Sequence, residues 1–246
     1  MPGYLEATFS AAGDERRIFR SEQKGRGIIL LHELPGLTAE TKELADWIVS
    51  NGFHVVMPLL FGVPLQSPAM GMVLAPAVCI RREFNCFVAG RSSPITDWLR
   101  ALCRHVHAEC GGPGIGVIGM CFTGGYILSL MADASVIAPV TAQPSLPFLQ
   151  SNGLDVDAQT LRAAAARADS APLLGLRFRE DKYCRQGRFD AINEAFCGST
   201  EVSCARFQQV IVEGEGHATL TFDYGKAARS VDTRQRVLEH LRAQLS

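Results

Sequence analysis

Residues 114–125 read GIGVIGMCFTGG, and this stretch decides which fold the sequence predicts. Its first seven residues (114–120) form a short apolar run typical of a buried strand, and helical sequence begins at about residue 122. Cys121 lies at the turn between the two. In such a strand-turn-helix unit, the side chain at the turn stands above the sheet, beside the positive end of the helix dipole. The alternative interpretation is a small buried cysteine on a glycine-rich turn.

Strands and helices alternate on both sides of this unit. Amphipathic helices are predicted over Thr38–Asn51 and from Ser93-Pro94, and apolar β runs at 26–32, 53–58, 135–142, 173–178 and 205–212. This alternation predicts right-handed βαβ units, and so an α/β fold whose mostly parallel sheet is covered by helices on both faces. The length of 246 residues fits one such domain, residues 1–246.

The composition is that of an ordinary globular protein. Hydrophobic residues make up 47% and charged residues 20%, which excludes a disordered chain. A net charge of −1 gives no general attraction to nucleic acid or to an anionic membrane. The stretch from Cys110 to Ala132 has no charged residue, but its glycines and Pro113 favour a strand, turn and helix over a membrane span.

The eight cysteines are interpreted through the N-terminus, MPGYLEATFS, which lacks the basic start and apolar core of a signal peptide. We therefore expect a cytoplasmic protein with reduced thiols and no disulfide framework. Cysteines other than Cys121 are expected to act as small hydrophobic residues.

Two residues suit a catalytic group together with Cys121. A cysteine nucleophile needs a base and an acid that orients the base, in the order nucleophile, acid, histidine for this architecture. Asp181 follows the strand predicted at 173–178, and His217 follows the strand predicted at 205–212. Because the carboxyl ends of parallel strands lie at one edge of the sheet, the loops after residues 32, 58, 120, 178 and 212 are expected to converge.

Alternatives stay open for these residues. Glu180 is a rival for the acid, Asp181 is otherwise an ordinary turn residue, and His217 a solvated loop histidine. The N–H of Phe122, at the start of the helix, is predicted to point at the oxyanion that forms when Cys121 attacks a carbonyl group.

Four stretches carry a family resemblance: LLHELPG at 30–36, GMCFTGG at 119–125, the acidic loop at Asp181, and GEGH at 214–217. Over about residues 25–245 the chain resembles the dienelactone hydrolase family of α/β-hydrolases. The resemblance implies a single-domain α/β-hydrolase that cleaves a small-molecule ester or lactone through an acyl-enzyme, without a cofactor. It also implies Cys121 as nucleophile, His217 as base, Asp181 as its orienting acid, and the Leu34 N–H as second oxyanion donor.

The resemblance extends to Glu33, which matches a glutamate that contacts the thiol in this family and holds it as a poor nucleophile until substrate binds. Two positions depart from the family. Thr123 stands where many members have glycine, so a β-branched residue crowds the turn. Thr221 stands where characterised members have an arginine that binds the substrate carboxylate, and this change counts against dienelactone itself as the substrate. Arg81 and Arg82 are candidates for that carboxylate, with solvated helix charge as the alternative.

Other interpretations are weaker. Residues 114–119 satisfy GxGxxG, but a dinucleotide site needs that motif after a strand, and here the motif is the strand. Cys103, His107 and Cys110 share a helix face but lack a fourth ligand with diagnostic spacing, so packing explains them better than a metal. No metal, nucleic-acid or membrane partner is predicted. The sequence does not indicate the oligomeric state. The alternatives in function are a thioesterase or general carboxylesterase, and a non-catalytic thiol-based sensor or binding protein.

Overall fold

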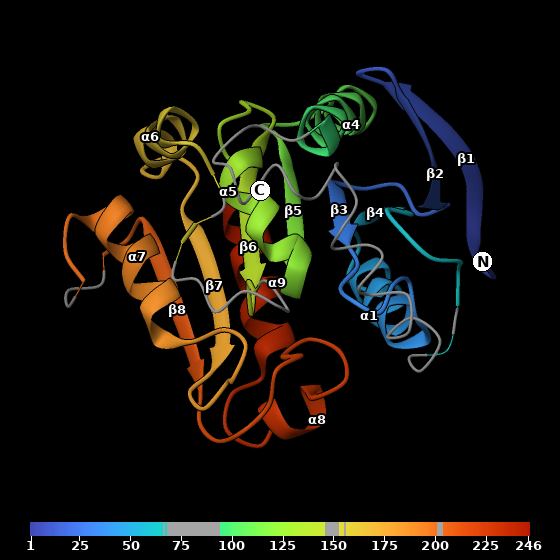
Figure 1. Ribbon diagram of the computed structural model, residues 1–246. Helices are drawn as coiled ribbons and strands as arrows, with labels where there is room; N and C mark the ends of the chain where they lie inside the picture. Colours follow the sequence, from blue (N-terminus) through green and yellow to red (C-terminus); the bar gives the residue numbers. More distant parts are fainter. Residues whose placement is uncertain (66, 68–93, 146–152, 155, 201–203) are drawn as a thin grey trace.

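The computed structural model describes residues 1–65, 67, 94–145, 153–154, 156–200 and 204–246. Its centre is an eight-stranded sheet in the order β1-β2-β4-β3-β5-β6-β7-β8 (Figure 1). The six strands from β3 to β8 run parallel, while β1 and β2 pair antiparallel at one edge. The strand bounds are β1 Tyr4–Ala11, β2 Asp14–Ser21, β3 Gly27–Leu31, β4 His54–Pro58, β5 Ile115–Met120, β6 Val136–Ala142, β7 Leu173–Phe178 and β8 Phe207–Val212.

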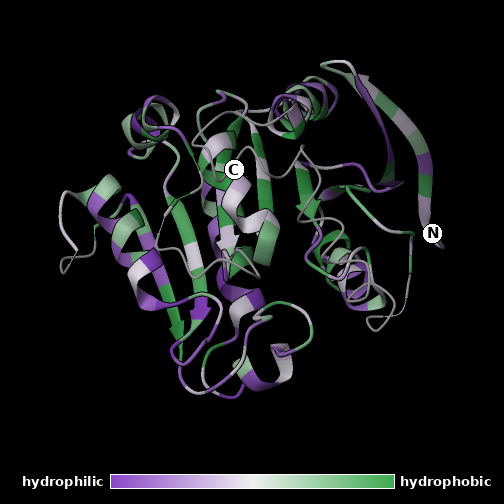
Figure 2. Ribbon diagram, viewed as in Figure 1, coloured by the Kyte–Doolittle hydropathy of each residue, from purple (hydrophilic) through white to green (hydrophobic). Residues whose placement is uncertain are grey.

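Helices cover both faces of the sheet, which confirms the predicted fold class. Their bounds are α1 Ala39–Ser50, α4 Pro94–Cys110, α5 Tyr126–Leu130, α6 Ala158–Arg167, α7 Gln186–Cys197, α8 Tyr224–Ala227 and α9 Thr233–Leu245, with a 3₁₀ turn, η2, at Cys121–Gly125. Side chains alternate along a strand, so Ile29 and Leu31 of β3 pack on the side of α4 to α7, while Ile28 and Leu30 pack on the side of α1 and α9. The central strands are accordingly apolar on both faces (Figure 2).

The sequence analysis missed the hairpin of β1 and β2. Only four of its sixteen strand residues are buried, and charged residues interrupt the apolar ones, as in DERRIFRS of β2. The hairpin is fixed to the main body because the Trp98 indole of α4 donates a hydrogen bond to the Phe9 carbonyl (3.2 Å). The helix predicted to begin at Ser93-Pro94 is α4. Ser93 lies outside the described residues, and α4 begins at Pro94.

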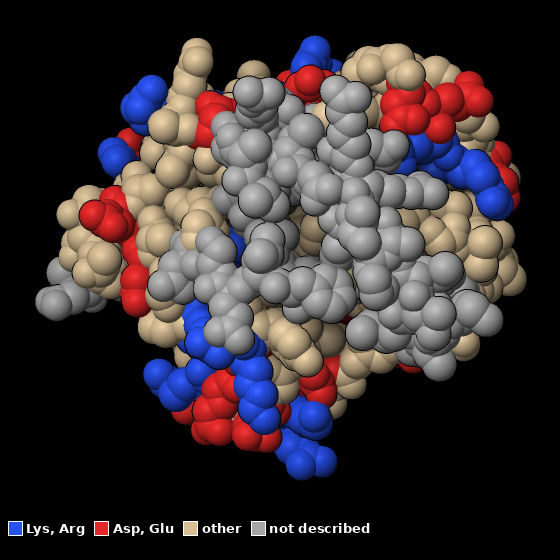
Figure 3. Space-filling view, viewed as in Figure 1, with Lys and Arg blue, Asp and Glu red and all other residues tan. Residues whose placement is uncertain are grey.

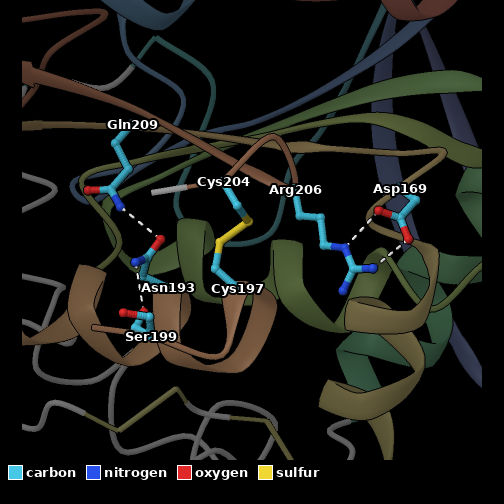
Figure 4. Close-up of a disulfide and its surroundings, with 7 residues drawn as sticks. All are labelled: Asp169, Asn193, Cys197, Ser199, Cys204, Arg206 and Gln209. Carbon is cyan, nitrogen blue, oxygen red and sulfur yellow. Dashed lines mark hydrogen bonds and ion pairs between the residues drawn. A yellow bond between two sulfur atoms is a disulfide. The ribbon is translucent and has the colours of Figure 1, made fainter. Parts of the chain in front are cut away.

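The prediction that all cysteines are reduced is wrong for two of them. Cys197, the last residue of α7, forms a disulfide with Cys204, just before β8 (Figure 4). A Cα–Cα distance of 5.8 Å lies in the range that a disulfide spans, and only folding brings the helix end to the strand start. Asn193 reinforces the join, since it donates to the Ser199 carbonyl and accepts from Gln209.

Charged side chains of both signs intermingle on the face drawn in Figure 3, with mixed clusters at its lower and upper edges. In the loops after β7 and β8, Arg179 pairs with Glu213 at 2.7 Å. None of the helices in the described part of the chain is long and apolar enough to span a membrane.

Candidate active site

The loops after β5, β7 and β8 bring together the three residues predicted from the sequence. His217 Nδ1 lies 2.7 Å from Asp181 Oδ2. On its other side, the His217 ring lies close enough to the Cys121 thiol for the two groups to interact, and this interaction raises the pKa of His217. Cys121 is 6% and Asp181 4% exposed, so both ends of this group of three residues lie mostly out of water.

Cys121 occupies a strained turn between β5 and η2. Its φ of +53° is in the left-handed region, which is costly for a residue with a side chain. Gly119 is required there, because a Cβ on it would lie 2.6 Å from the Thr123 carbonyl oxygen. This geometry presents the thiol at the C-terminal edge of the sheet and at the start of the helical segment, as the sequence predicted.

Thr123 stabilises the turn through hydrogen bonds of its hydroxyl, although its β-branched side chain crowds the turn. Its hydroxyl accepts a hydrogen bond from the Met120 N–H (3.0 Å) and lies within donating distance of the carbonyls of Met120 (2.9 Å) and Leu31 (3.3 Å). The hydroxyl therefore satisfies buried backbone groups that glycine would leave to other partners.

Ser145, which the sequence analysis did not single out, lies beside the thiol. Its Oγ is 3.4 Å from Cys121 Sγ, and its N–H donates to the Cys121 carbonyl (3.2 Å). A hydroxyl at this distance is able to donate to a thiolate and to hold it in place.

The carboxylate in contact with His217 is that of Asp181 and not that of its neighbour Glu180. Asp181 Oδ1 accepts hydrogen bonds from the N–H groups of Tyr183 (2.8 Å) and Cys184 (2.9 Å), which leaves Oδ2 for His217. Glu180 is exposed and lines a cavity outside this contact. The orientation of Asp181 is thus set by its own loop.

A buried arginine holds that loop. Arg177 of β7 is 1% exposed and donates to the carbonyls of Cys184 (2.9 Å) and Arg179 (2.7 Å) and to the Gln186 side chain (2.8 Å). The signal in the sequence was an arginine inside the apolar run LLGLRF, since a buried charge needs several partners.

His217 is held by its loop and by its neighbours. Asp223 Oδ2 accepts from the His217 N–H (2.9 Å) and the Ala218 N–H (3.3 Å). Burial by itself lowers the pKa of His217, but the hydrogen bonds and the charges of Asp181 and Cys121 offset burial and raise the pKa to about 11. The ring is therefore a strong acceptor for a thiol proton.

A cavity of about 250 Å³ lies against His217. The exposed Tyr183 ring stands edge-on to the imidazole, with the ring centres 5.2 Å apart. The other lining residues are Glu180, Lys182, Glu215, Gly216, Asp223 and Lys226. A small molecule thus has a route from solvent to the histidine.

Glu33 is buried near this group, but its hydrogen-bond partners are other residues than the predicted one, Cys121. Its carboxylate accepts hydrogen bonds from the Thr221 hydroxyl and from Gln143 Nε2 (3.4 Å), and no contact found among the described residues joins it to Cys121. Burial raises the pKa of Glu33, while Thr221, the charge of His217 and Gln143 act in the opposite direction.

Thr221 therefore has a function at the position where the family carries arginine. It is the hydroxyl partner of Glu33 and brings no positive charge. Arg81 and Arg82 lie outside the described residues.

The rival motifs are explained by the fold. Residues 115–119 of the GxGxxG match lie in β5 itself. Cys103 is buried in the core, while His107 Nε2 contacts the Gly112 carbonyl (3.0 Å). In the part of the chain that the structure describes, no group of three His, Cys, Asp or Glu side chains is arranged to hold a metal.

A model of the dienelactone hydrolase family matches residues 16–244. The chain belongs to this family. As a member, it is a hydrolase that acts on ester bonds, and a small-molecule substrate is expected of it. A comparison with curated protein sequences gave no match.

Solved structures share the fold at low sequence identity. A dienelactone hydrolase-like promiscuous phosphotriesterase from metagenomic libraries is 14% identical, with a TM-score of 0.64 over 98% of this chain and 95% of that one. An α/β serine hydrolase homologue from Coxiella burnetii is 16% identical, with a TM-score of 0.59 over 96% and 97%. An α/β serine hydrolase without a lid from Xanthomonas campestris is 13% identical, with a TM-score of 0.60 over 100% and 96%.

Proposed function

We propose that this chain, as one domain, hydrolyses a small ester or lactone with Cys121 as nucleophile, His217 as base and Asp181 as the acid that orients His217. The observation that carries the proposal is an imidazole that interacts with the thiol and is hydrogen-bonded to a carboxylate that its own loop holds in place. Nucleophile, base and orienting acid in contact are the signature of covalent catalysis.

The first half of the reaction forms a thioester. His217 takes the thiol proton as Cys121 Sγ attacks the carbonyl carbon, and the carbonyl oxygen becomes an oxyanion. The N–H groups of Phe122 and Leu34 donate to this oxyanion, and each such donor contributes up to about 3–4 kcal/mol. The tetrahedral intermediate collapses, the C–O bond to the alcohol breaks, and His217 gives its proton to the leaving oxygen.

The second half releases the acid. His217 removes a proton from a water molecule, and the hydroxide attacks the thioester carbonyl. The second tetrahedral intermediate expels Cys121 as a thiolate, which regains a proton from His217. Asp181 keeps the Nδ1 proton on the ring, so that Nε2 is free to accept and return protons throughout.

Direct proton transfer to His217 is favoured over a route through Glu33, because the thiol interacts with the histidine, while Glu33 has Thr221 and Gln143 as its hydrogen-bond partners. A thiol that Glu33 holds as a poor nucleophile stays a prediction, as does substrate binding by Arg81 and Arg82.

A thiol-based sensor is the alternative, and Cys184 bears on it. This second thiol lies close enough to Cys121 for their charges to interact, as a resolving partner would. However, burial above all, and the charge of Asp181, raise the pKa of Cys184 to about 12, so it is a poor thiolate. This supports hydrolysis over sensing.

The test is hydrolysis of p-nitrophenyl acetate by the wild type, Cys121→Ala and Cys103→Ala, with the burst and the steady rate followed separately. Cys103 is a buried free cysteine of α4 and serves as the matched control. We expect turnover in the wild type and in Cys103→Ala, and none above background in Cys121→Ala. A burst without turnover would point to a sensor, and equal turnover in all three proteins would refute the nucleophile.

A further inference from the structure

We propose that His32 is a positioning residue for the oxyanion hole, because its ring fixes the peptide plane that carries the Leu34 N–H. The inference rests on the proposed function, since Leu34 matters only if an oxyanion forms beside Cys121. His32 directly follows β3 and is completely buried. Because β3 ends at Leu31, His32 lies at the C-terminal end of this strand, directly before Glu33 and Leu34.

The two hydrogen bonds of the ring determine its tautomer. The Leu60 N–H donates to His32 Nε2 at 3.0 Å, and a backbone N–H is only a donor, so Nε2 is an acceptor. The proton of the neutral ring is therefore on Nδ1, which lies 3.3 Å from the Glu33 carbonyl oxygen and donates to it. Burial lowers the pKa of His32 to about 4, although the bond to Glu33 opposes this, so the ring is neutral at physiological pH.

The Glu33 carbonyl and the Leu34 N–H belong to one planar peptide unit, in which they point in opposite directions. Fixing the oxygen therefore fixes the direction of the N–H. Two donors hold that oxygen, the His32 ring and the Gly36 N–H (2.7 Å). A hydrogen bond to the oxygen also polarises the N–H on the far side of the same peptide.

The ring is also linked to Phe122, the residue that carries the other proposed oxyanion donor, through the ring of Phe61. Phe61 packs edge-on against His32, with ring centres 4.4 Å apart, and Phe122 packs against Phe61 at 6.4 Å. Leu60, whose N–H the ring accepts, is buried in the same core. His32 thus joins the loop after β3, the loop after β4 and the turn after β5.

A matched pair of variants separates the two bonds. In His32→Asn the amide nitrogen takes the position of Nδ1 and keeps the donor to Glu33. In His32→Gln the amide oxygen takes the position of Nε2, keeps the acceptor for Leu60 and loses the donor. We expect His32→Asn to keep kcat within about threefold of the wild type, and His32→Gln to lose roughly tenfold to a hundredfold in kcat with KM nearly unchanged.

Other outcomes overturn the inference. If His32→Asn loses activity and His32→Gln keeps it, or if both lose equally, the residue is a loop anchor and does not position the oxyanion hole. Cys121→Ala in the same assay separates the two failures, because full activity of that variant refutes the proposed function itself.

If neither variant folds, ¹⁵N NMR spectra of the histidine-labelled wild type test the inference through the tautomer of His32. The His32 signal must report a neutral ring with its proton on Nδ1. A proton on Nε2, or a charged ring at neutral pH, would overturn the inference.

Discussion

Asp181→Asn tests the proposed chemistry with little disturbance of the fold. Asp181 Oδ1 accepts from two backbone N–H groups, so an asparagine must place its only oxygen there to keep both bonds. Its NH₂ group then faces His217 Nδ1, which in the wild type lies 2.7 Å from Asp181 Oδ2. The ring is forced to accept at Nδ1, and its proton moves to Nε2, the atom that must take the proton of Cys121.

A forced wrong tautomer of this kind costs about 10⁴-fold in kcat in a serine triad, or about 5.5 kcal/mol of barrier. We therefore expect a loss of about 10³–10⁴-fold in kcat for p-nitrophenyl acetate, with the free energy of unfolding changed by less than about 1 kcal/mol. Glu180→Gln is the matched control, because this exposed neighbour has no hydrogen bond to His217 among the contacts of the described residues, and it should keep wild-type kcat. A kcat of Asp181→Asn within tenfold of the wild type, in a folded protein, would refute the assignment.

Three further predictions concern groups around this site and in the core. Burial lowers the pKa of His240 to about 4, although a hydrogen bond to the Pro139 backbone acts in the opposite direction. Between about pH 6.5 and pH 4, His240 is therefore protonated in the unfolded chain but neutral in the folded one. This group lowers the free energy of unfolding by about 2 kcal/mol between pH 7 and pH 5. Because the buried His32 contributes a fall of the same sign, urea unfolding of His240→Leu should show a fall that is smaller than that of the wild type by about this amount. Replacing Cys197 and Cys204 by serine should lower the free energy of unfolding by about 2 kcal/mol, since the bond closes a short loop, and a reductant should then have no further effect on stability. Arg177→Met removes the donor of three acceptors, of which the Cys184 carbonyl is buried, so chemical unfolding should show a loss of about 2–4 kcal/mol. The value of kcat should fall too, because the loop of Asp181 loses its anchor. Arg177→Lys should not restore either quantity, because an ammonium does not reproduce the guanidinium fork.

The sequence was sufficient for the parallel sheet and for the order of the three loops, because each central strand is an apolar run and Cys121 directly follows one of them. Asp181 and His217 come a few residues after the ends of two other strands. Because the carboxyl ends of parallel strands lie at one edge of the sheet, the sequence predicted that these residues and Cys121 lie close together. The hairpin of β1 and β2 escaped notice because only four of its sixteen strand residues are buried and charged residues interrupt its apolar ones.

Contacts distant in sequence were out of reach for a different reason. Thr221 and Glu33 are 188 residues apart, and nothing local to either one indicates the other. The same holds for Gln143, which donates to Glu33 and accepts from Thr219. The disulfide likewise depends on where α7 ends relative to β8, which only the folded chain specifies.

Each reacting group in this site has its own anchor, and two of the three anchors, Thr123 and Arg177, are buried. Thr123 joins the Cys121 turn to the end of β3, Arg177 holds the loop of Asp181, and Asp223 holds the loop of His217. A reacting group must stand at a strand end, so its position follows from the fold class. An anchor only has to reach a backbone group of its loop, so it can come from any element, and its position follows from packing. Changes at the anchors should therefore alter the alignment of the reacting groups, and with it kcat, before they alter the affinity for substrate.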